Sequence, residues 1–215
     1  MTGKRTTPAR AAADAPVAEG TREALLAAGR RLFSQQGYDA TSVRDLTSAA
    51  GANLGAVTYH FGSKQALYYA VVEEALRPFA DRVVEAASHG ADSMERVASV
   101  VVAYFDVLRE MPEVPFLLLQ EVAAGRGPPP PAVAALKRVL GAVADVAAAG
   151  QADGSVRAGD PRLFALSVIA QPIHLSIVAK VLATVAGLDQ TDAATRQRIT
   201  AHVVAFVQAG LREES

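Results

Sequence analysis

The chain has 215 residues, of which 51% are hydrophobic and 20% charged, so it can bury the core of one large domain or two small ones. It contains no cysteine, which excludes disulfides, thiolate zinc sites and cysteine nucleophiles. Residues 1–70 carry eight basic and five acidic side chains and the remainder thirteen and seventeen, a distribution expected when a nucleic-acid-binding region precedes a domain with another role.

The first nineteen residues have no uninterrupted apolar core of the kind that a secretory signal needs. We therefore expect residues 1–19 to form a disordered basic arm and the protein to be cytoplasmic. Two roles stay open for Lys4, Arg5 and Arg10: contact with the minor groove of DNA, as basic arms can make, or a tail without function.

The hydrophobic spacing of the first third predicts helices, and the chain has no run of alternating β-branched and aromatic residues that would predict a strand. A first helix is expected over about 21–36, with Gly37 closing it. Ser42 and Asp45 have the spacing of a capping box, in which the hydroxyl accepts a first-turn amide and the carboxylate bonds back. A short second helix should therefore begin at Ser42 and end at Gly51.

Two more helices are expected before the sequence changes character. Asn53 is predicted to cap a third helix that runs through Phe61, and Ser63 a fourth that runs to about residue 88. The fourth helix should bend near Pro78, because proline lacks the amide that an interior turn needs.

The segment 42–61 has the organisation of a helix-turn-helix, in which a glycine-containing turn joins two short helices and the second enters the major groove of DNA. Gly51 can take the positive φ that the turn requires, and Val57 and Phe61 can hold the second helix to the core. The residues expected to contact DNA are Thr41, Ser42, Arg44, Asn53, Leu54, Gly55, Ala56, Thr58, Tyr59, His60 and Lys64.

These residues have distinct expected roles. Gly55 and Ala56 permit close approach to the groove wall, and Thr58 can touch a base edge or a thymine methyl. Tyr59 and His60 can donate to phosphate oxygens, although such a pair can also cap a small core. Further phosphate anchors are expected where helices begin, at Thr41, Ser42, Ser63 and Lys64.

Four motifs follow one another through this region. They are Phe33-Ser-Gln-Gln-Gly-Tyr38, Ala40-Thr-Ser-Val-Arg-Asp-Leu46, Ala49-Ala-Gly51 and Tyr59-His-Phe-Gly-Ser-Lys-Gln-Ala-Leu67. Through them, Thr21 to about Glu74, a quarter of the chain, resembles the DNA-binding domain of the tetracycline-repressor (TetR) family of transcriptional regulators. The resemblance implies a homodimer on a pseudo-palindromic operator and a variable C-terminal domain that binds a small effector, usually with release of DNA. It also implies dimerisation through the last two long helices.

Three positions depart from the pattern of this family. Its members often carry a basic residue where Leu54 stands, a hydroxyl where Ala56 stands and a tyrosine where Thr58 stands. Base readout is therefore expected to depend on apolar and shape contacts, and the missing donors should lower specificity more than affinity.

After His89 and Gly90 the chain becomes more apolar, so a helical domain over 81–215 is expected to follow a DNA-binding domain over 20–80. Its helices are predicted over about 92–110, 113–125, 132–149, 161–186 and 191–212. The predicted helix starts are Asp92 with Glu95 and Asp160 before Pro161, and the predicted loops are 125–131 and 150–159.

The segment 163–188 is the most apolar in the chain, and its length would suit a bilayer. It is interrupted by residues that are costly or disruptive at membrane depth, namely Gln171, Pro172, His174 and Lys180. We therefore expect a helix buried in a bundle or a dimer, and no membrane partner.

An effector pocket is expected in the second domain, because apolar walls with a few polar groups suit a small, largely apolar ligand. The candidates are Tyr104, Phe105, Met111, Phe116, Gln120, Phe164, Gln171 and His174, although core packing explains most of them equally well. No catalytic residue, metal or cofactor is expected: the four histidines are scattered, and no phosphate loop after a strand or nucleophile-elbow serine is present.

The sequence thus predicts an all-α DNA-binding transcriptional regulator, a repressor that a small molecule releases from its operator. The alternative is a helical interaction or scaffold protein whose helix-turn-helix does not bind DNA. An enzyme has the least support. Salt-dependent binding to promoter DNA separates the first two, since phosphate contacts release counterions.

Overall fold

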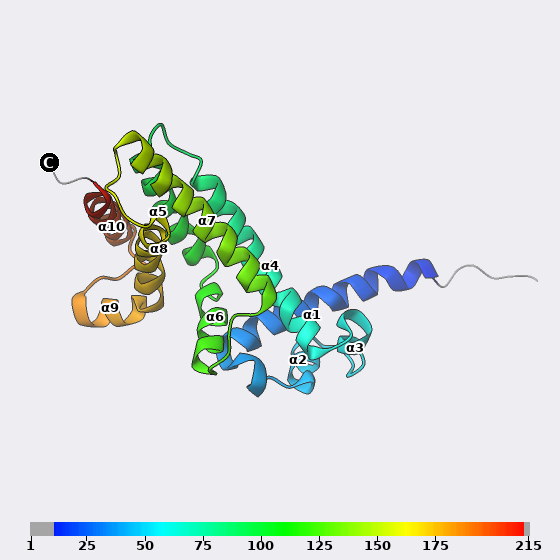
Figure 1. Cartoon of the computed structure of the whole chain (residues 1–215). Coiled ribbons are helices and arrows are strands. Elements are labelled where there is room, and N and C mark those ends of the chain that lie inside the picture. Colours follow the sequence, from blue (N-terminus) through cyan, green and yellow to red (C-terminus); the bar gives the residue numbers. More distant parts are fainter. Residues whose placement is uncertain (1–10, 213–215) are drawn as a thin grey trace, which may run out of the picture. The chain divides into compact units, whose positions relative to one another are not determined.

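The computed structural model describes the backbone of residues 11–212 and the side chains of residues 19–212. Ten α-helices and no strand occur in that range, which confirms the predicted all-α class (Figure 1). They form two compact units, one ending at Val71 and one beginning at Val72, so the division falls inside helix α4 (Lys64–Ala86). It precedes the predicted boundary at residue 80, because Phe79 already packs on Tyr104 of the second unit.

The N-terminal unit contains α1 (Ala11–Ala40), α2 (Val43–Ala49), α3 (Ala56–Phe61) and the first part of α4. Helix α1 begins earlier than predicted, so residues 11–19 of the expected disordered arm are helical. Alanine has the highest helix propensity, and this stretch is rich in it. Residues 1–10, with Lys4, Arg5 and Arg10, lie outside the described residues.

Gly37 divides α1 where the sequence predicted its end. With φ 80° and ψ 175°, it leaves the helical region, and a last helical piece continues to Ala40. Only glycine adopts this conformation without strain. The break turns the chain toward α2, and Tyr38 follows it directly.

The core of this unit is built by the inward faces of its helices. Its largest fully buried side chains include Leu25, Phe33, Leu46, Val57 and Leu67. Tyr68 joins them with its ring centroid 4.9 Å from that of Phe33 and 5.1 Å from that of Tyr38. At Gly29 a Cβ atom would lie 2.8 Å from Val71 Cγ2, so α1 and α4 approach closely.

The predicted capping box at α2 is confirmed, and the predicted start of α3 is wrong. The Asp45 amide donates to Ser42 Oγ over 3.1 Å, and the Ser42 amide donates to Asp45 Oδ2 over 2.9 Å. Helix α3 begins at Ala56, where the Ala56 amide donates to the backbone carbonyl of Asn53 over 3.0 Å. That carbonyl, instead of the Asn53 side chain, accepts the first amide, so the helix begins two residues later than predicted.

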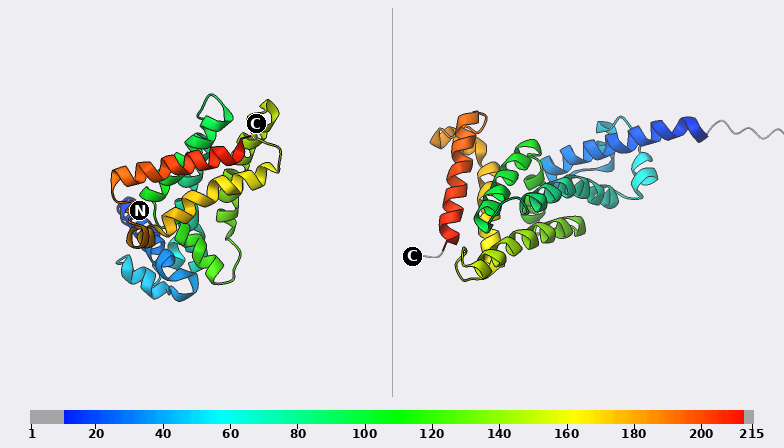
Figure 2. Two further views of the ribbon diagram at one scale, coloured as in Figure 1. Left: turned by 90° about the vertical axis from the view of Figure 1, so that its left-hand side faces the viewer. Right: turned by 90° about the horizontal axis from the view of Figure 1, so that it is seen from above.

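The C-terminal unit contains the rest of α4 and six further helices. These are α5 (Ser93–Glu110), α6 (Val114–Ala123), α7 (Pro130–Asp153), α8 (Pro161–Ile177), α9 (Ala179–Ala186) and α10 (Ala193–Leu211). Helix α8 is central, since it packs on α5, α7 and α10, and α10 (red) lies beside α8 (yellow) in both views of Figure 2. The predicted caps are confirmed: Asp92 accepts from the Glu95 amide over 2.8 Å, and Asp160 accepts from the Arg162 amide over 2.9 Å.

The helix predicted over 161–186 is in fact two helices, α8 and α9, bent by 71° at Val178. A side chain from a later turn stabilises the break: Gln190 Nε2 donates to the carbonyl of Leu175 over 2.9 Å. In a continuous helix that carbonyl would accept the amide of Ala179. No single described helix is long and apolar enough to cross a membrane; α8 and α9 meet the length and composition only together.

Helix α7 also differs from its prediction. It runs from Pro130 to Asp153, into the predicted 150–159 loop, and ends at Gly154 with φ 79°. Gly150 stays helical because it lies in the packed interior, where a Cβ would meet Val156 Cγ2 at 2.4 Å.

Candidate nucleic-acid interface

Helix α3 has one buried face and one exposed face. Val57 is fully buried, whereas Thr58 is exposed and Tyr59 is 79% exposed. Leu54, in the turn before the helix, is 61% exposed. A short helix anchored on one side and presenting a hydroxyl, a phenol and an apolar side chain on the other can enter a groove of DNA.

Ala56 does not belong to this exposed face, so its predicted exposure is wrong. Its side chain is buried, because the helix begins at Ala56 and the first turn directs this position inward. Gly55, the N-cap residue, is exposed and leaves the surface before the helix without a side chain. Asn53 is exposed beside it, and its side chain caps nothing.

Thr41 is buried completely, so its hydroxyl is not presented to a phosphate at the surface as the sequence predicted. Its hydroxyl donates to the carbonyl of Gly37 over 2.7 Å and accepts from Gln36 Nε2 over 3.2 Å. Because both contacts lie inside the unit, the hydroxyl joins the break in α1 to the start of α2.

Ser42 and Arg44 remain at the surface. The Ser42 hydroxyl donates its proton to Asp45 Oδ2 over 2.6 Å, so that proton is already used within the capping box. Hydrogen bonds from the Ser42 side chain and backbone hold the pKa of the Asp45 carboxyl below its ordinary value. The start of α2 is therefore anionic at neutral pH, which leaves the exposed Arg44 guanidinium as the group that suits a phosphate there.

The start of α4 combines a cap with a positive charge. Ser63 Oγ accepts the Ala66 amide over 3.1 Å, and Lys64 Nζ lies 4.2 Å from the ring centroid of Tyr38. The cation–π contact fixes the position of the ammonium. The predicted anchor at Lys64 thus has a charge, a helix N-terminus and a defined position.

Sequence reasoning did not assign roles to Tyr38 and Arg22 at this surface. Tyr38 orients Lys64, and the Arg22 guanidinium of α1 lies 5.3 Å from the ring centroid of Phe61 in α3. The His60 ring, half-buried, stands edge-on to Tyr59 at 4.8 Å between centroids. These pairs join different helices or depend on rotamers, so no spacing in the sequence could have indicated them.

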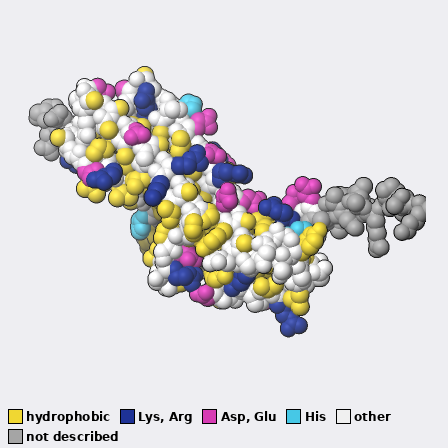
Figure 3. Space-filling view, turned by 45° about the vertical axis from the view of Figure 1, so that its right-hand side comes forward, with side chains coloured by type: hydrophobic (Ala, Val, Ile, Leu, Met, Phe, Trp, Pro, Cys, Tyr) yellow, Lys and Arg dark blue, Asp and Glu magenta, His cyan; other side chains and the backbone are white. Residues whose placement is uncertain are grey.

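Basic side chains do not form one continuous block on the face drawn in Figure 3, where Lys and Arg lie among acidic and apolar side chains. Arg44 and Lys64 are separate positive positions, one in α2 and one at the start of α4. Such an arrangement suits a series of individual phosphate contacts.

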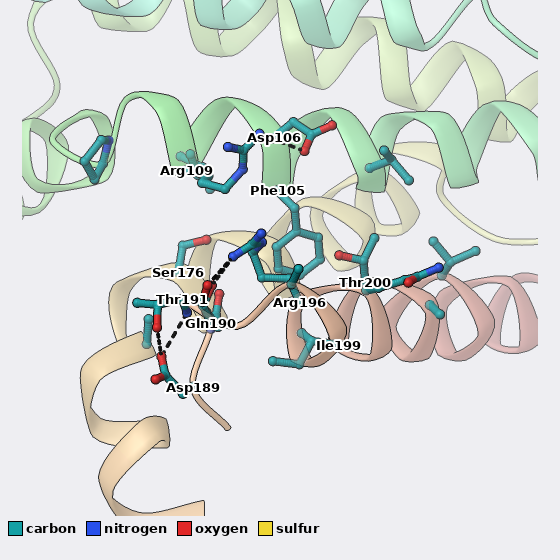
Figure 4. Close-up of a pocket in the computed structure, with 18 of the residues that line it drawn as sticks. Phe105, Asp106, Arg109, Ser176, Asp189, Gln190, Thr191, Arg196, Ile199 and Thr200 are labelled. Atoms are coloured by element: carbon teal, nitrogen blue, oxygen red, sulfur yellow. Dashed lines mark hydrogen bonds and ion pairs between the residues drawn. The ribbon is translucent and has the colours of Figure 1, made fainter. Parts of the chain in front are cut away.

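The C-terminal unit holds a cavity of about 970 Å³ between α5, α9, α10 and the turn at 189–191 (Figure 4). Of the eight residues predicted to line a pocket, only Phe105 lines it; Tyr104, Met111, Phe116, Gln120, Phe164, Gln171 and His174 do not. Phe105 and Tyr104 are neighbours on α5, but successive helical positions face different directions.

The other predicted pocket residues have different surroundings. Tyr104 is buried edge-on against Phe79 at 5.2 Å, and this burial raises the pKa of its phenol. Phe164 is buried beside Gly159 with the Arg157 guanidinium 4.8 Å from its ring centroid. His174 is exposed. Among the described side chains, no three His, Asp or Glu residues are grouped to hold a metal ion.

Comparison with known proteins connects this geometry to a family. Residues 25–71 match the family model described as bacterial regulatory proteins, tetR family. The transcriptional repressor AcnR of Corynebacterium efficiens is 37% identical over 75 residues, which are 35% of this chain and 39% of AcnR. The chain therefore matches about two fifths of the length of this curated relative.

Solved structures are similar over both units. A TetR family regulator from Marinobacter aquaeolei VT8 is 17% identical with a TM-score of 0.74, covering 93% of this chain and 99% of that one. AibR, solved in complex with isovaleryl coenzyme A and operator DNA, is 17% identical with a TM-score of 0.70, covering 86% and 97%. The structures show the shared fold, and the family model identifies the DNA-binding domain. Residues 25–71 therefore form a domain of the tetR family of bacterial regulatory proteins, in a chain whose fold is shared by the solved structures.

Proposed function

We propose that this protein is a transcriptional repressor that binds a pseudo-palindromic operator as a homodimer and dissociates when a small effector binds. The observation that carries the proposal is helix α3, held by the buried Val57 and presenting Thr58 and Tyr59 to solvent. The repressor AcnR and the operator complex of AibR support it by similarity. The proposal places the protein in the cytoplasm, with the DNA that it binds, and includes no catalytic activity.

The proposed interface with DNA contains contacts to phosphates and contacts to bases. Arg44, Tyr59 and Lys64 offer a guanidinium, a phenol and an ammonium to phosphates, which set position and affinity. Leu54 and Thr58 face the bases, where a leucine or a threonine methyl can pack on a thymine methyl. Sequence preference thus depends on a few apolar contacts, so it should be modest.

The homodimer is supported by apolar side chains left exposed on α8 and α10. Leu166 is 51% exposed and Phe206 59% exposed, and Leu163 lies near Leu166 on α8. Exposed apolar side chains on neighbouring helices indicate an association surface. A two-fold dimer pairs identical surfaces and presents two recognition helices to a palindromic site.

An effector site is supported by the cavity in the C-terminal unit. Its volume of about 970 Å³ is at the upper end of the range for small-molecule sites. The structure of AibR with isovaleryl coenzyme A shows that a protein of this fold takes a small ligand.

Salt-dependent DNA binding tests the repressor against the scaffold alternative. The full chain is titrated with a fragment of its own upstream DNA, followed by fluorescence anisotropy at 50 and 200 mM salt. With about six phosphate contacts, affinity should fall by about a thousandfold. The variant Arg44→Gln should reduce the salt slope, while Arg212→Gln, at the far end of the chain, should not change it. Absence of salt-dependent binding would support the scaffold protein.

A further inference from the structure

The cavity between α5, α9 and α10 has an apolar body and charged groups at its wall. The apolar wall is formed by Ala98, Val102, Phe105, Leu108, Ile199 and Val204. The cations that line it are Arg109, Lys180 and Arg196, and the acids are Asp106 and Asp189. Such a lining suits an amphipathic ligand. Whether the polar end of that ligand is a cation or an anion depends on which charged side chains of the lining are already paired.

Most of these charges already have partners. Arg109 Nη2 lies 3.5 Å from Asp106 Oδ1 and 3.7 Å from Glu110 Oε1. Asp189 Oδ1 accepts from the amide and the hydroxyl of Thr191, each over 2.8 Å, and these bonds lower the pKa of its carboxyl. Asp106 is therefore paired with a cation, whereas Asp189 keeps its negative charge. Arg196 and Lys180 still exceed the unpaired acids of the lining by one positive charge.

Arg196 differs from these groups. Its Nη1 donates to the carbonyls of Gln190 and Thr191 over 3.0 and 2.7 Å, and it makes no ion pair with any described side chain. The nearby Asp192 caps α10 through the Thr195 amide at 2.7 Å, a bond that lowers the pKa of the Asp192 carboxyl, and the Arg196 charge helps to lower it from beyond ion-pair distance. Arg196 is half-buried, and Figure 4 shows it beside Phe105, below Asp106 and Arg109.

An arginine in this position favours an anion. Two carbonyls hold the guanidinium in place, and carbonyls orient its charge without neutralising it. A carboxylate can accept bidentate hydrogen bonds from such a group, and partial burial strengthens them. Lys180, on α9 and also at the cavity wall, adds a second positive charge.

We propose that this cavity binds a small monocarboxylate with an aliphatic chain, its carboxylate on Arg196 and its chain along Phe105, Val102 and Val204. Binding of this ligand does not depend on the proposed function. Only its role as the effector that releases DNA rests on that function. Each added CH₂ group buried along the apolar wall should tighten binding about fourfold until the cavity is filled.

The first test measures ligand binding without DNA. Hexanoate, octanoate and octanol are titrated into the full chain by isothermal calorimetry. Octanoate should bind at least tenfold more tightly than octanol, and more tightly than hexanoate. Equal affinity of octanol and octanoate, or no carboxylate binding, would overturn the proposal.

Variants locate the site. Arg196→Gln should weaken octanoate binding at least tenfold, and Arg196→Lys should restore part of it. Arg198→Gln is the matched control, because Arg198 is exposed on the same helix and does not line the cavity. Circular dichroism checks that the variants fold, and the wild-type chain-length comparison remains decisive if they do not. Octanoate binding that is insensitive to Arg196→Gln contradicts the proposal. The proposal is also contradicted if Arg196→Gln weakens the dimer while the wild type binds no carboxylate, because a second copy of the chain would then fill the cavity.

DNA binding separates this inference from the proposed function. Octanoate should lower the affinity for upstream DNA in the wild type and much less in Arg196→Gln. Salt-dependent DNA binding without octanoate binding would refute the inference and leave the repressor intact. Octanoate binding without any DNA binding would refute the repressor and leave the carboxylate site.

Discussion

Adjacent hydroxyl residues take opposite roles in the N-terminal unit. Thr41 is buried and bonded to Gly37, whereas Ser42 is exposed and caps α2. Both residue types can bind a phosphate, so only their different burial distinguishes their roles. Burial and facing also distinguish two neighbouring aromatic residues, since Tyr104 lies in the core and Phe105 lines the cavity.

Replacing Thr41 should affect stability. Thr41→Val keeps the shape but leaves the Gly37 carbonyl without its donor, so the free energy of unfolding should fall by about 1–3 kcal/mol. Urea denaturation followed by circular dichroism measures this loss. The control Thr58→Val, at an exposed position, should change stability by less than about 0.5 kcal/mol. A stable Thr41→Val that fails to bind DNA would restore Thr41 as an anchor.

Tyr59 and Thr58 should differ in their effect on DNA binding. Tyr59→Phe removes one phosphate hydrogen bond, worth about 0.5–1.5 kcal/mol, so operator and unrelated DNA should weaken by the same factor. Thr58→Ala should instead change the ratio of the two affinities. Anisotropy titrations on both DNAs measure this; a ratio that moves in Tyr59→Phe and not in Thr58→Ala would reverse the assignment.

At the level of the helices, the caps at Asp92 and Asp160 were predictable and the break between α8 and α9 was not. Asp92 and Asp160 cap the helices that follow them. These caps can be predicted because each joins residues only two or three positions apart. The break between α8 and α9 depends instead on Gln190, fifteen positions after the carbonyl of Leu175 that it binds. A contact over that separation leaves no periodic signal in the sequence.

The start of α8 should respond to acid. Hydrogen bonds from the side chain and backbone of Arg162 lower the pKa of Asp160 to about 2, below the roughly 3.9 of an unfolded aspartate. Because the folded pKa is the lower one, the stabilisation is fully present above about pH 4 and is lost as the pH falls through 2. Carboxyl NMR titration should show this midpoint, and Arg162→Gln should raise it. An Asp160 midpoint near 4 in the wild type would refute the cap's contribution.

At the scale of the whole molecule, the proposed dimer should depend on the exposed face of α8 and α10. Leu166→Arg places a charge in that face in both copies, at a cost of about 3 kcal/mol or more, so dimer dissociation should increase over a hundredfold. Sedimentation equilibrium measures the dissociation constant. Val122→Arg, at a 71% exposed position on α6, is the control. An unchanged dimer in Leu166→Arg would place the interface elsewhere.

The all-α class, the helix-turn-helix and the caps at Ser42, Asp92 and Asp160 can be predicted from local sequence, because they depend on residues within a few positions of one another. The burial of Thr41 and Ala56, the contact of Lys64 with Tyr38 and the position of Arg196 beside Phe105 at a cavity become visible only in the folded chain. Each of these depends on which helix faces meet, and packing between distant segments sets that.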